Sequence, residues 1–148
     1  MATITTNISQ VFNRLKSNFE LLEDKEYLLR PLAIEVLPLM KERIHIEGKA
    51  SDDSQIGTYS NGYMRAREKA GRGESRKVIV ALTSQLEQDW SVQPTQTGYG
   101  IGFNNKINVD KMRWVEEHKG KIIANLAPEE KKYIKERLQE LVDGAFNS

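Results

Sequence analysis

Few side chains in this sequence have the type and spacing that catalysis or metal binding requires. The chain has two histidines, His45 and His118, and no cysteine. His45 is followed by Glu47, Asp52 and Asp53, and this cluster could in principle bind a metal. Its spacing, however, matches neither a zinc-binding helix nor a calcium-binding loop. We therefore predict no metal site.

Serine nucleophiles and phosphate-binding loops are not indicated either. No serine has the sequence context of a nucleophile elbow. Gly98, Gly100 and Gly102 are not followed by a Lys-Ser or Lys-Thr pair, nor directly by a helix, as a phosphate-binding loop would be. Glu116 and Glu117 are adjacent in sequence, so on a helix they point away from each other. The sequence predicts a protein that is not an enzyme and that needs no cofactor.

The densest charge lies between residues 65 and 77. Its six basic residues are Arg65, Arg67, Lys69, Arg72, Arg76 and Lys77. The four arginines among them are candidate interface residues. Two glutamates in the same stretch leave a local excess of +4. Such an excess could contact phosphate groups or an acidic patch on a partner protein. The plainer interpretation is a solvated, flexible loop.

Composition predicts one domain, residues 1–148, with a polar surface. The chain has 148 residues, 29% of them charged, and a net charge of +1. A charge this small gives no global field that would attract nucleic acid or a membrane. No apolar run has the length of a membrane span, and the N-terminus does not resemble a signal peptide. With no cysteine, synthesis in a reducing cytoplasm is the expectation.

Apolar spacing predicts helices towards both ends of the chain. The first carries an apolar stripe at Ile8, Val11, Phe12, Leu15, Phe19 and Leu22, with Thr5 or Thr6 as its cap. A second stripe runs from 29 to 44, where Pro31 fits the first turn and Pro38 should kink or divide the helix. The last helix begins at Pro128 and carries Ile134, Leu138, Leu141 and Val142 on its inward face.

The stretch 82–120 is predicted to form the centre of the fold. A buried strand at 78–82 leads to Thr83, which could cap a helical turn carrying Leu86. The runs SV and YGIGF then flank the turn PTQTG, which predicts a hairpin. In YGIGF the bulky side chains all lie on one face, so the face of Gly100 and Gly102 is bare. We expect another segment, chain or ligand to lie against that bare face.

A helix is expected after the hairpin, capped by Asn108 or Asp110 and ended by Gly120. Trp114 lies off its apolar stripe, so it is either an interface anchor or is packed beneath a neighbouring loop. Residues 47–77 read as a long Gly- and Arg-rich loop excursion. The expected fold class is α+β, with a small, mostly antiparallel sheet packed against three to four helices.

The order of these pieces resembles the virion-morphogenesis and tail-completion family of tailed bacteriophages. Leu82, Thr83, Gln85 and Leu86 resemble the family's leucine-threonine-glycine-x-leucine motif, with Ser84 in place of the usual glycine. Gly102, Gly120 and the segment 126–130 resemble its later motifs, and the arginine-rich excursion resembles the segment before them. The chain departs from the family where relatives carry an aromatic-alanine pair and a proline-arginine-proline run; here stand Met112-Arg113-Trp114 and Lys121-Ile122-Ile123.

The resemblance implies a non-enzymatic structural protein at the head–tail junction of a virion. Such proteins assemble as homo-oligomeric rings at the neck or tail top and contact portal-side or tail proteins. DNA passing through the ring could make non-specific contact with the excursion. A nucleic-acid-binding module using residues 65–77 is the alternative function, and a small enzyme around His45 and the acidic loop is a further one.

Overall fold

The computed structural model describes residues 10–147, except 11–12, 15, 18–19, 21–22, 74, 81–84 and 97. Its elements are α2 (Lys25–Glu42), η1 (Arg43–Glu47), α3 (Asn61–Lys69), α4 (Gln85–Gln88), β1 (Trp90–Pro94), β2 (Tyr99–Phe103), α5 (Lys106–Lys119) and α6 (Pro128–Asn147). The fold is α+β, with a two-stranded antiparallel sheet among helices. No helix in the described part of the chain is both long and apolar enough to span a membrane.

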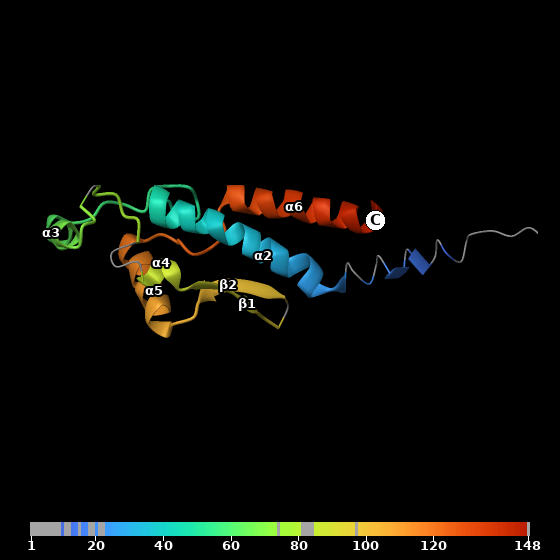
Figure 1. The fold of residues 1–148 in the computed structure, drawn as a ribbon. Helices are drawn as coiled ribbons and strands as arrows, with labels where there is room; N and C mark the ends of the chain where they lie inside the picture. Colours follow the sequence, from blue (N-terminus) through green and yellow to red (C-terminus); the bar gives the residue numbers. More distant parts are fainter. Residues whose placement is uncertain are drawn as a thin grey trace, which may run out of the picture.

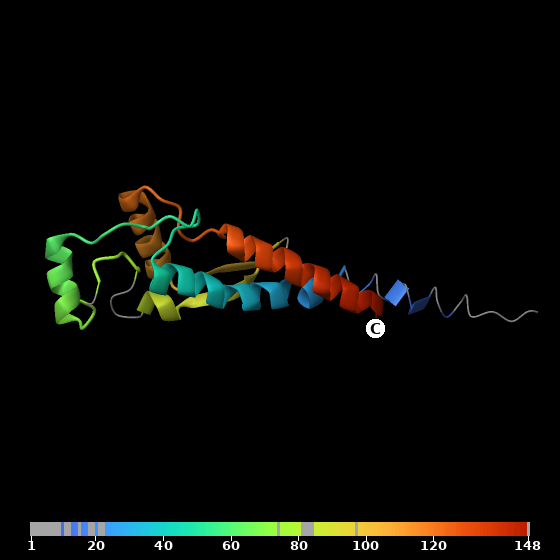
Figure 2. The same ribbon diagram turned by 90° about the horizontal axis from the view of Figure 1, so that it is seen from above.

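The molecule is elongated, with α2 along its length (Figure 1). Helix α6 runs beside α2 on one side and the β1–β2 hairpin lies on the other, while α5 crosses near the end of α2 (Figures 1 and 2). Helix α3 lies at that same end, farthest from the start of α2. The apolar positions of the predicted first helix lie outside the described residues.

Helix α2 is continuous, so Pro38 does not divide the second helix, which was one of its two predicted effects, a kink being the other. Both prolines lie inside it, so Pro31 is not in the first turn as predicted. The helix begins earlier, after an N-cap at Asp24 whose carboxylate accepts from the backbone N–H groups of Glu26 and Tyr27. Pro38 removes one helical N–H donor, but it is exposed, so the carbonyl it leaves without a partner is accessible to water. The opposite stripe, through Val36, stays packed in the core.

A π-helical turn, η1, ends this long helix and changes the direction of its side chains. Three consecutive residues, Arg43, Ile44 and His45, are buried there. In a regular α-helix, three consecutive residues point in different directions and cannot all be buried against one packed element. They serve different partners, since Arg43 reaches α6 whereas His45 reaches β1. Gly48 then ends the turn in the left-handed conformation.

Gly48 and Gly120 allow a matched test of glycine conformation. Both are left-handed, with φ of +67° and +64°. A Cβ on Gly48 would lie 2.4 Å from the Val78 carbonyl oxygen, whereas one on Gly120 would meet nothing within 4 Å. Gly120→Ala should therefore cost only the left-handed backbone penalty, about 1 kcal/mol. Gly48→Ala should lower the free energy of unfolding by at least twice as much as Gly120→Ala, as measured by urea unfolding. Equal unfolding midpoints for the two variants would contradict the close contact at Gly48.

The 47–77 excursion is not a simple loop, because it contains α3 and contributes to the core. Ser60 caps α3 by accepting from the Tyr63 backbone N–H. Isolated bridges pair Lys49 with Gln55 and Thr58 with Lys77. Its buried residues are Ala50, Ile56, Tyr59, Met64 and Arg67. Only Met64 and Arg67 have helical spacing, and the stretch is rich in glycine and small polar residues, which is why the sequence pattern suggested a loop.

The predicted strand at 78–82 is also absent where the structure describes it. Lys77 makes the isolated bridge to Thr58, and Val78 to Val80 follow without strand pairing. Val78 and Val80 are buried as expected. The backbone N–H groups of Ile79 and Val80 instead donate to the Tyr59 hydroxyl, each at 3.2 Å. Thr83, the predicted cap of α4, lies outside the described residues, while the predicted turn carrying Leu86 is confirmed.

The hairpin prediction is confirmed, and its register explains the bare face. Trp90 pairs with Phe103 and Val92 with Ile101, so the bulky residues share one face. Phe103 and Ile101 pack against the core. Gly102 pairs with Ser91 on the other face, and a Cβ added to Gly102 would meet nothing within 4 Å. On the same face a Cβ added to Gly100 would lie 3.2 Å from Thr95 Cγ2, so among the described residues the expected packed segment is found at Gly100 only as the turn residue Thr95, and not at Gly102.

Two predicted helix termini are confirmed and one cap is corrected. Helix α6 begins at Pro128 and Gly120 caps α5 in the left-handed conformation. The N-cap of α5 is Asn105, whose side chain accepts from the Ile107 backbone N–H. Asn108 and Asp110, the two predicted caps, both lie inside the helix, and Asn108 is buried and donates to the Asp89 carboxylate at 2.9 Å. Asp89 thereby ties the start of the hairpin to α5.

Candidate functional site

An apolar groove of about 860 Å³ lies where α5, α4 and the segments around 59–63 and 78–80 meet. Leu86, Val78 and Val80 are buried in its floor. Trp114 and Ile107 of α5 also line it, yet each is 61% exposed. Tyr63 of α3 lines the groove as well and is 41% exposed. Large apolar side chains therefore face solvent beside an apolar floor.

Trp114 is held in place by its own helix. Its ring stacks on His118, one turn further along α5, with centroids 4.8 Å apart and planes 7° from parallel. This pairing fixes the indole without covering it. A large side chain that is already ordered loses little conformational entropy on binding, which is the property of an interface anchor. The alternative sequence interpretation, packing of Trp114 beneath a loop, is not what the structure has.

The Tyr59 side of the groove is rigid because a stack of side chains supports it. The Arg67 guanidinium lies over the Tyr59 ring at 4.4 Å, and the Tyr63 ring lies tilted against Tyr59 at 4.9 Å. The Tyr59 hydroxyl accepts the two backbone hydrogen bonds from Ile79 and Val80. Burial raises the pKa of Tyr59, so the phenol is neutral at physiological pH. The wall is thus pre-formed.

Beneath the groove, a histidine and a tryptophan join η1 to the hairpin. Trp90 Nε1–H donates to His45 Nε2 at 2.8 Å, and His45 Nδ1–H donates to the Ile79 carbonyl at 3.2 Å. Both ring nitrogens are therefore used, in the neutral tautomer. Burial, with the nearby Lys41 charge, lowers the pKa of His45 to about 4. His45 is a structural residue of the core and does not face the acidic loop.

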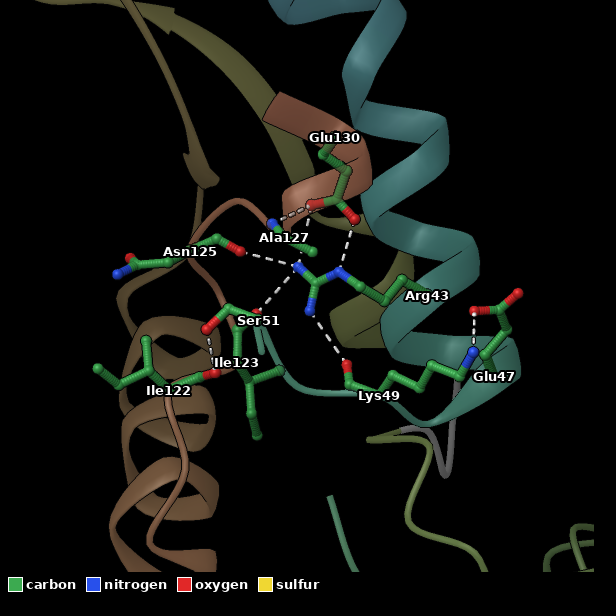
Figure 3. A network of polar contacts seen from close by, with 9 residues as sticks. All are labelled: Arg43, Glu47, Lys49, Ser51, Ile122, Ile123, Asn125, Ala127 and Glu130. Carbon is green, nitrogen blue, oxygen red and sulfur yellow. Dashed lines mark hydrogen bonds and ion pairs between the residues drawn. The ribbon is translucent and has the colours of Figure 1, made fainter. Parts of the chain in front are cut away.

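A second polar cluster fixes the start of α6 against the end of α2 (Figure 3). Arg43 Nε donates to Glu130 at 2.6 Å, and its terminal nitrogens donate to Glu130 and to the carbonyls of Lys49, Ile123 and Asn125. Glu130 also accepts from the Ala127 backbone N–H at 3.0 Å. Arg43 and Glu130 are 4% and 3% exposed. With their hydrogen-bonding capacity used internally, these charges are structural.

Three of the four arginines in the basic stretch have partners within the chain, although Arg76, like Arg65, is exposed. Arg67 is 1% exposed, so its prediction as a surface interface residue is wrong. Arg72 lies 3.8 Å from Glu87, and Arg76 donates to the Tyr59 carbonyl at 3.2 Å. Arg65 is exposed on α3. The sequence could not separate them, because burial of Arg67 depends on the aromatic ring of Tyr59.

The structure does not bring the predicted interface residues together. Trp114 lines the groove, whereas no hairpin residue does. Gly100 and Gly102 lie on the face of the sheet that carries Ser91 and Gln93. The sequence reasoning missed Ile107 and Tyr63 as groove residues. Ile107 lies off the apolar stripe of α5, as Trp114 does, and that shared signal could have found it.

Within the described residues, no three histidine or acidic side chains are close enough to hold a metal. Comparisons with known proteins add no assignment: no family model matches the chain, and no similar protein was found among curated proteins or solved structures. The groove is therefore interpreted from its own geometry.

Proposed function

We propose that this protein is a structural subunit of a tailed-phage virion, acting in head–tail joining or tail completion by ring-forming self-association. Its partners would be further copies of itself and other neck, portal-side or tail proteins, and its location the head–tail junction. The groove with the exposed Trp114 is the observation that carries the proposal. Exposed apolar side chains around a preformed apolar groove are typical of protein–protein interfaces.

The elongated shape supports association through different surfaces. The groove lies at the α3–α5 end of the molecule, and α2 separates it from the other end (Figures 1 and 2). When one patch of a subunit meets a different patch of the next, the contact is heterologous and can close into a ring. The proposal therefore needs a second surface away from the groove.

The alternative, nucleic-acid binding through 65–77, has less support from the same residues. A binding surface for phosphate needs several free, exposed cations. Here Arg67 is buried and Arg76 donates to a backbone carbonyl. Salt-sensitive binding to a DNA duplex that is lost in Arg65→Ala would favour this alternative over the ring.

Self-association is tested by measuring mass against concentration. Wild-type protein should form closed oligomers in multi-angle light scattering and rings in electron microscopy. Trp114→Ala should weaken each contact about 30-fold or more, because hot-spot aromatic residues contribute about 2 kcal/mol or more. Its thermal stability should stay close to wild type, because Trp114 is 61% exposed.

Arg113→Ala is the matched control, since Arg113 is an exposed neighbour on the same helix. It should assemble like wild type. A wild-type protein that remains monomeric at the highest soluble concentration, with and without a portal-side partner, would refute the ring. Equal assembly by Trp114→Ala and Arg113→Ala would refute the role of the groove.

A further inference from the structure

The groove has a length that suits a short helix. Ile107 and His118, which both line it, are eleven residues apart on α5. At 1.5 Å per residue this is about 16 Å, or three helical turns. A helix docking in such a groove inserts apolar side chains at positions i, i+3, i+4 and i+7.

The N-terminal segment of this chain has that pattern over the same length. Its apolar residues from 8 to 19 are Ile8, Val11, Phe12, Leu15 and Phe19. These positions follow the helix-in-groove spacing, and they too extend over eleven residues, about 16 Å in a helix. The described residues between them are helical and exposed, and they are Gln10, Asn13, Arg14, Lys16 and Ser17.

The position of this segment favours a groove on another copy. Its described residues continue outward from the start of α2, at the end opposite the groove (Figures 1 and 2). Helix α2 has 18 residues, so about 27 Å of helix separates the two ends. To reach its own groove, the segment would have to reverse at Asp24 and return along the whole of α2. A neighbouring copy can present its groove without that reversal.

We infer that the apolar face of residues 8–19 docks in the Trp114 groove of a second copy of this chain. The contact is head-to-tail, because the segment and the groove lie at opposite ends of one subunit. This supplies the second surface that the proposed ring requires, so the inference rests on the proposed function. Each subunit then donates one segment and receives one.

Cross-linking tests this contact, and the absence of native cysteine makes the background low. Leu15→Cys and Lys111→Cys are made as two separate full-length variants, mixed, and treated with a short linker that joins two thiols. Lys111 lines the groove and is exposed, so the cysteine should be reactive there. The mixture should give a dimer containing one copy of each variant. Asn13→Cys, from the exposed polar side, is the control and should link at least tenfold less.

A double variant, Leu15→Cys with Lys111→Cys, distinguishes docking within a chain from docking between chains. It should give a ladder of linked multimers. An internally linked monomer as the main product would overturn the inference, as would equal linking by Asn13→Cys and Leu15→Cys. If wild type assembles but the mixed Leu15→Cys and Lys111→Cys variants do not cross-link, the inference is overturned while the proposed ring still stands. If wild type is monomeric, the ring fails, and the mixed cross-link still tests the docking because it traps a pairwise contact.

Discussion

Replacing Glu130 with glutamine should lower the free energy of unfolding by about 3 to 5 kcal/mol, the usual cost of removing one partner from a buried ion pair. The carboxylate accepts from Arg43 at 2.6 and 3.2 Å and from the Ala127 N–H at 3.0 Å. An amide has one acceptor oxygen, so at least one buried donor would face another donor. Arg43 would keep its charge without a compensating anion.

Arg137→Ala is the matched control, because Arg137 also joins α6 to α2 through a glutamate. Arg137 Nε lies 3.0 Å from Glu35, but both side chains are 32% exposed. Water can solvate the remaining carboxylate, so this variant should lose only a small fraction of the Glu130→Gln effect. Urea unfolding monitored by circular dichroism measures both. Similar midpoints for the two variants would show that the Arg43–Glu130 pair is not the tie between the helices.

Acidification should destabilise the fold through His45 before most carboxylates titrate. The pKa of His45 is about 4 in the folded chain, against an ordinary value of 6.5. Between these values the unfolded chain binds a proton that the folded chain does not. The contribution of neutral His45 to the free energy of unfolding is therefore fully present above pH 6.5. It is lost as the pH drops towards 4, and the total loss is about 3 kcal/mol. Below pH 4 His45 adds no further loss.

His45→Gln isolates this contribution. The amide can accept from Trp90 Nε1–H and donate to the Ile79 carbonyl, the two hydrogen bonds that His45 makes, but it does not titrate. Unfolding free energy measured from pH 7.5 to 4 should therefore be much flatter in this variant. His118→Gln, at the other histidine of the chain, which is exposed, is the matched control. A wild-type slope in His45→Gln would refute the assignment.

Local patterns predicted the regular elements well where one face was apolar. The register of YGIGF, with bulky residues alternating with glycine, correctly gave the hairpin and its bare face. Pro128 and Gly120 correctly marked the start of α6 and the end of α5, because their backbone conformations are nearly independent of tertiary context. The local pattern did not predict that α2 continues through Pro38, because that continuity depends on which side of the helix faces solvent.

The excursion shows where local pattern is insufficient. Its arginines have similar sequence surroundings, yet Arg67 is buried over Tyr59 and Arg65 is exposed. A guanidinium is buried only where an aromatic face or acceptors compensate for its lost hydration, and those come from the folded chain. Net charge therefore overestimated the basic surface between 65 and 77.

Side-chain periodicity, with glycine and proline geometry, was enough to predict the fold class, the hairpin, the terminal helix and the off-stripe position of Trp114. The packing of the folded chain was needed to show that Trp114, Ile107 and Tyr63 share one groove, and that Arg43, His45 and Arg67 are buried. Those residues come from elements far apart in the chain. Their contacts depend on how the helices pack, which local periodicity does not specify.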